Sequence, residues 1–564
     1  MKRIFLLCVC LTALLIGQSA FSQNVGQLPA PTLVPPTLVP TPDTGIFDTI
    51  PTESGVARIA RNGVVRVGML YNEPPFGLLN IRGDVAGYDA DLARSMAEAW
   101  GVDVQFVQVT RQTALELLRS GQVDLLIAAQ VHRRELDAQV EFSQTYVISS
   151  QAMMVREGDP ALTLADMASR RVGVVLGTPA QNALAAWQTR SAINLSVQTY
   201  LTLSQAVTAL LTDQVDGLVD ARTRLLRAVA QPELVTLLDE AIAQEPYAVA
   251  MLRQDINLRN LVNRTLQYLM RSGRIYEIHN ANVPEVPWRE ETIPLWANLG
   301  DTAPRPDQFP ADIAYPAQYV LPRVMTERVV RVAGALDSTS IDTPESLRRL
   351  DALNRALVET MAARWGVTVQ YVPNSAANPL EFVANGQADI AVGVQPDWNW
   401  SDRVDFTQVY FMRGYRLMVE QNSEIVDFSG LRGGRWVGVE IGDPNVRQAA
   451  IDAATAANAR IEVLQTNDAA YAMLVDNNAD VGFGDTLWLL PQLEANAGLL
   501  RLTERWYTRT FISLAVPRND IDFRLLVEYT LQDLSQDGTL ALLLQPVIPP
   551  GETMRLEVWP GLSG

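Results

Sequence analysis

The stretch MAEAWGVDVQFV, residues 96–107, recurs as MAARWGVTVQYV at residues 361–372, which is 265 positions further along the chain. The same spacing relates VVRV at 64–67 to a second VVRV at 329–332. Solenoid repeats have periods of roughly 20 to 50 residues, so a repeat at this spacing indicates a duplicated domain. Each copy is long enough to bury a hydrophobic core of its own.

The repeat keeps its register over most of both copies. The first copy runs from Val64 to about Ile278, and the second runs from Val329 to about Leu542. One residue is missing from the second copy, so that VEFSQTY at 140–146 matches VDFTQVY at 404–410. The sequence therefore predicts two domains of the same fold in tandem.

Strand and helix patterns alternate along the first copy, which indicates an α/β fold. Leu92, Met96 and Trp100 recur at the spacing of one helix face. DLLIAA at 124–129 is a continuous apolar run, which is typical of a strand buried on both faces of a parallel sheet. The expected elements are strands at 64–70, 102–106, 124–129, 172–177, 197–202, 215–220 and 247–252, with helices between them and a last helix from about 258 to 273.

The N-terminus has the pattern of a secretory signal peptide, which we predict at residues 1–22. Lys2 and Arg3 precede an uncharged apolar run from Ile4 to Ile16, and Ala20-Phe21-Ser22 offers a cleavage position. The run is shorter than the about 20 apolar residues of a membrane span. We therefore expect an exported, soluble protein, periplasmic or extracellular, that meets a membrane only through a partner or an uncleaved leader.

Composition excludes several kinds of chemistry. Cys8 and Cys10 lie in the leader and outside a lipoprotein-type site, so the mature chain has no thiol, and Lys2 is the only lysine, which excludes Schiff-base catalysis. His132 and His279 are the only histidines and are far apart, so we expect no metal and no cofactor. The formal net charge of −18 makes nucleic acid an unsuitable partner.

Two proline-rich segments divide the chain. Residues 23–58 read as an extended stalk, and residues 279–327 read as a linker between the copies. The linker also carries tryptophans and tyrosines, so it is expected to pack onto the domains, either fixing their orientation or only covering them. The expected domains span 59–278 and 328–545, followed by a tail at 546–564.

An ordered set of motifs in the first copy points to a known family. The motifs are YNEPPFG (71–77), GYDADLARSMAEAWGV (87–102), SGQVDLLIAA (120–129), EFSQTY (141–146), RVGVVLGT (171–178) and VDGLVD (215–220). In this order they resemble the bacterial solute-binding proteins of family 3, the capture components of amino-acid ABC importers. The second copy shows the same resemblance more weakly.

The resemblance implies a fold and a motion. Each copy would be a type II periplasmic-binding-protein domain, with two α/β lobes, a hinge of two crossing strands and an interlobe cleft. Ligand would bind in the cleft, and the lobes would close on it by hinge motion. In the first copy the crossings would fall near Val147–Ala152 and Tyr247–Met251.

Ligand contacts in the first copy follow from the same resemblance. Glu73 lies just past the first strand, where open α/β sheets bind ligands, although its segment also reads as a rigid turn. Thr178 begins a helix whose N-terminus suits a carboxylate, or caps that helix only. Asp220 ends a strand, where the family pairs an acid with the ligand ammonium group and where turn residues are also common. The predicted contacts are Tyr71, Asn72, Glu73, Phe76, Gln130, Thr178 and Asp220.

The second copy departs further from the family pattern. YNEPPFG is replaced by LDSTSID at 336–342, and a loop adds Trp398 and Trp400, which would either stack on a solute or fill the cleft. Asp443 would cap its helix well but repel a carboxylate. The predicted contacts in this copy are Asp337, Gln395, Trp400, Asp443 and Asp485.

Both copies lack the family's arginine, which grips the amino-acid carboxylate with two hydrogen bonds. Leu136 stands at its position in the first copy and Trp400 in the second. Arg133 and Arg134 are close in sequence but shifted by two or three residues. The ligand's chemical identity is therefore left open.

Three functions fit these observations. The leading hypothesis is a noncatalytic binder that captures a small polar, amino-acid-like solute for the membrane subunits of an ABC importer. The alternative is a sensory or scaffold protein whose closed state is read by a partner. An enzyme of the dehydratase or lyase type is the third, and it would need an acid or base with a tuned pKa, for which no motif is evident.

Overall fold

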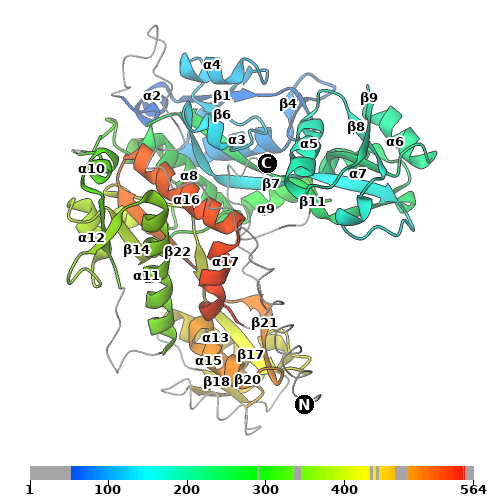
Figure 1. The fold of residues 1–564 in the computed structure, drawn as a ribbon. Helices are drawn as coiled ribbons and strands as arrows, with labels where there is room; N and C mark the ends of the chain where they lie inside the picture. The colour runs from blue at the N-terminus through cyan, green and yellow to red at the C-terminus, as the bar shows by residue number, and fades with distance from the viewer. Residues whose placement is uncertain are drawn as a thin grey trace, which may run out of the picture.

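The computed structural model describes residues 53–286, 288, 292–316, 318–335, 345–431, 436–439, 444–463, 479–549 and 552. They form two α/β domains, drawn blue to green and green to red in Figure 1. The expected signal peptide, most of the stalk and most of the tail lie outside the described residues. Within the described part, no helix combines the length and apolarity that crossing a membrane requires.

Domain 1 is built on one eight-stranded sheet with the order β5-β1-β6-β11-β7-β10-β8-β9. Neighbouring strands are parallel within each end of the sheet, and the two long strands in the middle are antiparallel to each other. The strands are β1 (Val64–Met69), β5 (Asp103–Gln108), β6 (Leu125–Leu126), β7 (Val140–Arg156), β8 (Arg171–Val175), β9 (Ser196–Tyr200), β10 (Gly217–Ala221) and β11 (Val235–Leu252), with a small sheet of β2 (Asn72–Glu73), β3 (Gly77–Leu79) and β4 (Val85–Ala86) beside them.

Helices cover both halves of this sheet, and each lobe has two hydrophobic clusters of its own. The expected helix face is confirmed, because Leu92, Met96 and Trp100 are all buried in the first lobe. Gly101 ends that helix with φ 69°, a left-handed conformation that glycine adopts at little cost. The helices are α2 (Gly55–Asn62), α3 (Tyr88–Trp100), α4 (Ala114–Arg119), α5 (Pro179–Ser191), α6 (Leu203–Leu211), α7 (Arg222–Ala228), α8 (Ile256–Arg271) and α9 (Arg274–Asn282).

The hinge of domain 1 consists of β7 and β11, which run through both lobes. The first crossing lies where expected, since Val147–Gln151 pairs with Ala243–Tyr247 between the two ends of the sheet. The second prediction was wrong by several residues, because Ala250 already pairs with Leu126 of the first lobe. Polar residues and Pro246 hide the first half of β11 from a pattern search, so only its apolar end was recognised.

Domain 2 repeats this order with two sheets in place of one, β13-β12-β14-β22-β15 and β19-β18-β20-β17-β21. Its strands are β12 (Val329–Ala333), β13 (Thr368–Tyr371), β14 (Ile390–Val394), β15 (Val404–Phe406), β16 (Phe411–Arg413), β17 (Tyr415–Glu420), β18 (Trp436–Val439), β19 (Arg460–Val463), β20 (Val481–Asp485), β21 (Leu500–Trp506) and β22 (Thr510–Pro517). Its helices include α10 (Val320–Glu327), α11 (Glu345–Trp365), α12 (Pro379–Ala384), α13 (Pro444–Ala456), α15 (Thr486–Ala495), α16 (Ile521–Gln536) and α17 (Thr539–Leu544).

The hinge strands of domain 2 are interrupted. Gly414 separates β16 from β17, and a short break separates β21 from β22. A side chain at Gly414 would meet the carbonyl oxygen of Thr508 at 2.0 Å, so the two crossing segments approach each other there more closely than a Cβ allows.

Each domain has a short N-terminal helix that starts before the predicted boundary: α2 begins in the predicted stalk, which ended at residue 58, and α10 lies within the predicted linker. The N–H of Gly55 donates to Asp255 at 2.6 Å, and the N–H of Val320 donates to Asp520 at 2.7 Å. These are equivalent positions of the two copies. The helices α2 and α10 also bury apolar residues in the cores of their domains. Both domains therefore start earlier than residues 59 and 328.

The linker packs against both domains. The ring of Trp296 lies 4.5 Å from that of Trp398 and 5.2 Å from that of Phe406, both in domain 2. Its backbone N–H donates to Gln267 of domain 1 at 2.9 Å. Trp296 of the linker thus contacts both domains at once. These contacts favour the expected role of fixing the orientation of the domains over a role of covering them only.

The two first lobes meet through reciprocal contacts between α8, α16 and the segments beside them, at the centre of Figure 1. Arg259 donates to Asp405 at 2.9 Å, and Arg524 donates to both oxygens of Glu141 at 2.7 and 2.8 Å. Arg259 and Arg524 are equivalent positions of the repeat, as are Glu141 and Asp405. The two copies therefore pack with pseudo-two-fold symmetry, as the subunits of a symmetric dimer do.

Candidate functional site

The structure brings two predicted contacts, Glu73 and Asp220, into electrostatic range of each other from opposite lobes. Glu73 ends β2 beside the first lobe, and Asp220 lies on β10 of the second lobe. Burial raises the pKa of Asp220, and the charge of Glu73 raises it further. With Arg111 and Glu245, described below, these residues form what we call the interlobe cluster.

Asp220 is the least satisfied member of the interlobe cluster. Its side chain is 2% exposed. The N–H of Ala221 donates to Oδ1 at 2.7 Å, and Nε of Arg224 lies 3.4 Å from the same oxygen. Oδ2 is buried and has no hydrogen-bond partner among the described residues. A buried acceptor without a donor lowers stability by about 1–3 kcal/mol. A donor from a bound molecule would remove this cost.

Glu73 is paired with Arg111, whose Nη2 lies 2.8 Å from Oε2. Arg111 follows β5, at the same end of the parallel strands as Glu73, and sequence reasoning missed it. The sequence could have identified Arg111, because polar residues just past the ends of parallel strands lie together at one edge of a sheet.

Glu245 is the second acid that sequence reasoning missed. It lies on β11 at the hinge, is 7% exposed, and accepts a hydrogen bond of 3.0 Å from Nε2 of Gln151 on β7. Burial raises its pKa, while Gln151, Arg133 and Arg111 act in the opposite direction. It was missed because this half of β11 was not recognised as a strand.

Four other predicted contacts lie in the first lobe and beside the hinge, in different settings. Phe76 is buried, with its ring 4.8 Å from that of Tyr247. Tyr71 is half-buried against the core of the first lobe, and Asn72 is exposed. Gln130 holds the hinge, since its carbonyl oxygen accepts a hydrogen bond of 3.0 Å from the N–H of Ala248.

The helix start at Thr178 is confirmed, with Pro179 as the first residue of α5. The capping differs from the expected arrangement. Thr178 donates its hydroxyl to the carbonyl of Val175 at 2.7 Å, and Gln181 accepts from the N–H of Gly177 at 2.8 Å. The side chain of Thr178 therefore does not cap its helix. Pro179 has no N–H, and the N–H of Gln181 donates to the carbonyl of Thr178 at 3.1 Å, so within the described structure Ala180 is the residue of this first turn whose N–H remains for another acceptor.

The equivalent acid of domain 2 is neutralised within the protein. Asp485 Oδ1 accepts from the N–H of Leu487 at 3.0 Å, and Oδ2 accepts from Nε of Arg413 at 3.1 Å. Arg413 occupies the position that Ser149 holds in domain 1. Burial raises the pKa of Asp485, and Arg413 is the main opposing influence.

The remaining predicted contacts of domain 2 do not gather around Asp485 in the described structure. Gln395 is exposed, and Trp400 is half-buried against the core with the guanidinium of Arg403 4.5 Å from its ring centre. Asp337 and Asp443 lie outside the described residues. Of the predicted contacts of this domain, the described structure therefore leaves Asp485 as the one in a site-like setting, where it is paired with Arg413.

The arginines near the family's missing position have separate locations. Arg134 reaches domain 2, where its Nε donates to Gln532 at 2.7 Å. Arg133 is exposed and makes no ion pair with the described residues, and its charge acts on Glu245. Leu136 packs against a core of the first lobe. Only Arg133 is thus available to a ligand among these three.

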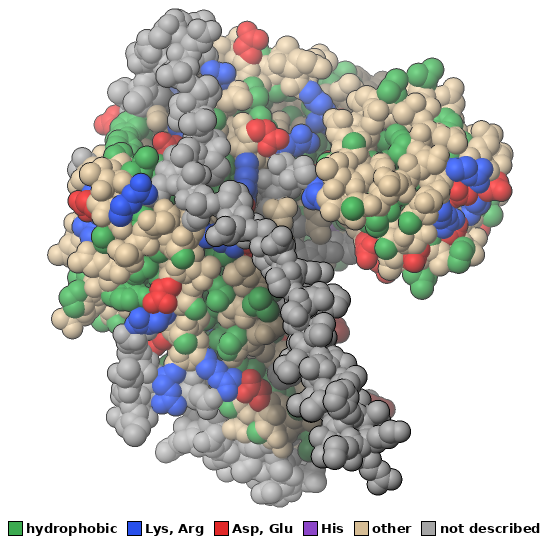
Figure 2. Space-filling model, viewed as in Figure 1, with side chains coloured by type: hydrophobic (Ala, Val, Ile, Leu, Met, Phe, Trp, Pro, Cys, Tyr) green, Lys and Arg blue, Asp and Glu red, His purple; other side chains and the backbone are tan. Residues whose placement is uncertain are grey.

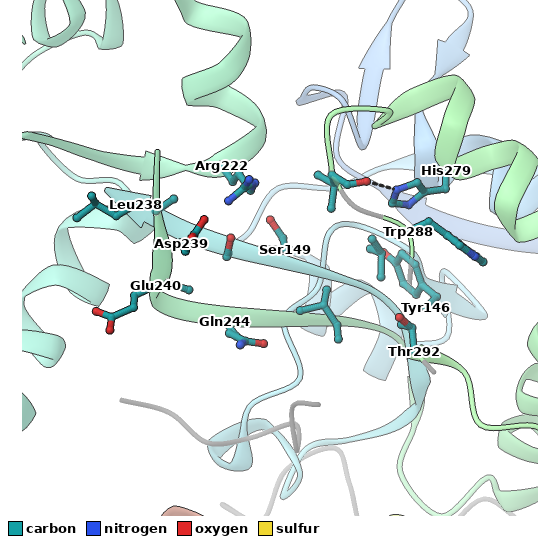
Figure 3. A pocket seen from close by; sticks show the side chains of 16 residues that line it. Tyr146, Ser149, Arg222, Leu238, Asp239, Glu240, Gln244, His279, Trp288 and Thr292 are labelled. Atoms are coloured by element: carbon teal, nitrogen blue, oxygen red, sulfur yellow. Dashed lines mark hydrogen bonds between the residues drawn. The ribbon is translucent and has the colours of Figure 1, made fainter. Parts of the chain in front are cut away.

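A separate cavity of about 350 Å³ lies beside the hinge strands β7 and β11 (Figure 3). Arg222 and Gln244 line it from the second lobe, while His279 and Trp288 line it from the end of domain 1 and the linker. None of the predicted ligand contacts lines this cavity. It is therefore distinct from the interlobe cluster.

Surface charge of both signs is mixed over the face visible in Figure 2, with no basic stripe there. Among the described residues, no three His, Cys, Asp or Glu side chains come together in a way that could hold a metal ion.

The family model for bacterial extracellular solute-binding proteins, family 3, matches residues 65–284 and 351–547, more than half of the chain. The protein belongs to this family, with two tandem copies of its domain. Its fold is accordingly that of tandem type II periplasmic-binding-protein domains.

The chain is also similar to individual named proteins. The chain is 26% identical over 238 residues to the ABC transporter glutamine-binding protein of Bacillus subtilis, covering 41% of this chain and 85% of the relative. It is 28% identical over 190 residues to a probable histidine-binding protein of Campylobacter jejuni, covering 33% and 71%. A solved ancestral cationic amino-acid solute-binding protein is similar at 24% identity and a TM-score of 0.36, covering 41% and 99%.

Proposed function

We propose that the protein is an exported, noncatalytic binder that captures a small polar solute with an ammonium group, as in an amino acid, between the lobes of domain 1. The lobes close on the solute, which then passes to the membrane subunits of an ABC importer. The observation that carries this proposal is the buried Oδ2 of Asp220, which has no hydrogen-bond donor among the described residues and which an ammonium group would supply with one.

The names of the relatives support a solute of this class. Glutamine and histidine, which two of the relatives are named as binding, carry both an ammonium group and a carboxylate. In our proposal Asp220 binds the ammonium group. Arg133 and the N-terminus of α5 meet the carboxylate, in place of the family arginine that Leu136 replaces.

Domain 2 does not bind an amine in this proposal. The guanidinium of Arg413 already stands where the ammonium group of a solute would bind Asp485. This pairing favours a second candidate function, in which domain 2 is a scaffold or docking module that a partner protein recognises. An importer subunit and a sensory protein are both partners of that kind.

Thermal unfolding of the mature chain tests the proposal, against a panel of amino acids, amines, organic acids and sugars. A solute at about 100 times its dissociation constant adds roughly 2.7 kcal/mol of stability. We expect a shift with an amine-bearing solute that Asp220→Asn abolishes and Asp485→Asn keeps. A panel without any shift, on protein shown to be free of bound solute, would reject capture of these solutes and leave the scaffold role.

A further inference from the structure

The loop of residues 130–139 in domain 1 connects the interlobe cluster to domain 2. At one end, the carbonyl of Gln130 and the N–H of His132 are hydrogen-bonded to β11 at Ala248 and Pro246, next to Glu245. Arg133, the arginine that we assign to the solute carboxylate, follows directly. At the other end, Asp137 and Arg134 are bound by helix α16 of domain 2.

Tyr529 on α16 is the centre of this attachment. Its hydroxyl donates to Oδ2 of Asp137 at 2.5 Å and lies 3.2 Å from the carbonyl of Arg134. The guanidinium of Arg134 stands 4.7 Å from the centre of the tyrosine ring, within the range of a cation–π contact. Asp137 in turn holds His132, whose Nε2 is 2.8 Å from Oδ1. One residue of domain 2 thus contacts two residues of this loop directly, and Asp137 links it to a third, His132.

The repeat creates a matched contact on the other side of the pseudo-two-fold axis. Trp398 of domain 2 is equivalent to Arg134, and Arg264 of domain 1 is equivalent to Tyr529. The guanidinium of Arg264 lies 5.6 Å from the ring centre of Trp398, and Nε1 of Trp398 donates to Gln267 at 2.9 Å. Each side therefore pairs one cation with one aromatic ring.

This arrangement favours pairing of a domain 1 with a domain 2 over pairing of two identical domains. If two first copies met through the same face, Arg134 would oppose Arg264, and two like charges would lie together. If two second copies met, Trp398 would oppose Tyr529 without a cation. Specific interfaces commonly exclude wrong partners by such repulsive pairs. The loop of domain 1 is therefore matched to α16 of domain 2 in particular.

We infer that domain 2 positions the solute site of domain 1, with Tyr529 as the positioning residue that fixes the loop at 130–139. The inference rests on the proposed function, because it assigns domain 2 a role in that same site. It explains how a domain with a neutralised site of its own contributes to capture. Tyr529 acts through Asp137 and Arg134 and touches no solute.

Hydrogen exchange of the full-length mature chain tests this without any ligand. The N–H groups of His132, Leu136, Asp137 and Gln139 are all hydrogen-bonded and report on the loop. Tyr529→Phe keeps the ring and removes the hydroxyl, so we expect exchange in 131–139 to rise about tenfold, as for one lost hydrogen bond to a charged group. Trp398→Phe is the matched control, and it should speed exchange in 396–403 while leaving 131–139 unchanged.

Two results would overturn the inference: unchanged exchange of 131–139 in Tyr529→Phe, or the same rise in both variants throughout both domains. A second arm measures the affinity of wild type and Tyr529→Phe for L-glutamine and for any solute that shifts the panel. We expect the variant to bind severalfold more weakly at an unchanged melting temperature of domain 2. If no solute binds wild type, the proposed function fails, while the exchange experiment still decides whether domain 2 holds the loop.

Discussion

Domains 1 and 2 share their fold and register, but the equivalent aspartates Asp220 and Asp485 differ in their hydrogen bonding. Among the described residues, Oδ2 of Asp220 is buried and has no hydrogen-bond partner, whereas both carboxylate oxygens of Asp485 are hydrogen-bonded within the domain. The difference follows from one hinge position, which is Ser149 in domain 1 and Arg413 in domain 2. In domain 2 a single built-in cation thus completes the hydrogen bonding of Asp485.

The largest expected effect is a loss of stability at the interface between the domains. It tests whether the two symmetry-related ion pairs contribute equally to the free energy of unfolding. Arg524→Met leaves Glu141 and Glu528 buried with one positive partner fewer, and breaking a buried ion pair costs about 3–5 kcal/mol. Arg259→Met should cost less, because Asp405 also accepts a hydrogen bond of 2.9 Å from the N–H of Asn519. Urea unfolding of both variants measures the order.

The double variant Glu141→Gln with Arg524→Met is the control for this comparison. Removing the charge of Glu141 as well leaves Glu528 as the one buried carboxylate that has lost its arginine, so the double variant should lose less stability than the sum of its single changes. Equal losses in Arg524→Met and Arg259→Met would show that the two sides of the interface do not differ.

The next effect concerns a buried acid that only domain 1 has. Burial raises the pKa of Asp89 from 3.8 to about 6, and the equivalent residue of domain 2 is the uncharged Asn354. An acid with a raised pKa in the folded state favours folding at low pH and loses that contribution as pH rises from about 4 to 6. The shift corresponds to up to about 3 kcal/mol. Asp89→Asn should remove this fall in stability.

Asn354→Asp is the reciprocal change and should introduce a similar pH dependence into domain 2. Both side chains accept a hydrogen bond from a tyrosine hydroxyl, at 2.8 Å from Tyr146 and 2.6 Å from Tyr410, so both variants keep their main contact. Unfolding measured at several values of pH from 4 to 7.5 compares them. Parallel profiles for wild type and Asp89→Asn would contradict the assignment.

A smaller effect concerns Asp220 and Asp485, for which we expect opposite changes in the free energy of unfolding on substitution by asparagine. Asp485→Asn leaves Arg413 without its carboxylate and should destabilise the protein by about 1–2 kcal/mol. Asp220→Asn removes a buried, incompletely paired charge and should leave stability unchanged or slightly higher. Thermal unfolding without solute distinguishes the two. Destabilisation of the same size in both would mean that Asp220 is a structural residue.

The smallest effect is a chemical rescue of domain 2. Arg413→Ser copies the hinge position of domain 1 and leaves Oδ2 of Asp485 without its donor. Millimolar methylguanidine should then raise the melting temperature of this variant and not that of wild type, by less than about 1 kcal/mol of stability. If methylguanidine raised the melting temperatures of wild type and Arg413→Ser equally, it would not be binding at the place that the Arg413 guanidinium had left.

Much of the fold could be predicted, because the repeat and the apolar patterns are local in sequence. Leu92, Met96 and Trp100 identify α3 and its buried face, and Thr178-Pro179 identifies the start of α5. The early starts of α2 and α10 were missed, since short helices capped by an aspartate two hundred residues away leave a weak local signal.

The site was predicted less completely, for reasons that lie in long-range pairing. Glu73 and Asp220 were predicted as ligand contacts because both lie at strand ends, and the structure brings them within electrostatic range of each other. Arg413 was not, because its importance depends on Asp485, 72 residues further along the chain. Trp398, which the sequence placed in a cleft, lies in the interface between the domains. Only contacts between distant segments reveal these roles.

Isothermal titration of the full-length mature chain with the best solute of the panel tests the central claim most directly. The account predicts one solute per chain, with binding lost in Asp220→Asn and retained in Asp485→Asn. Two solutes per chain, or binding that depends on Asp485 and not on Asp220, would contradict the assignment of capture to domain 1.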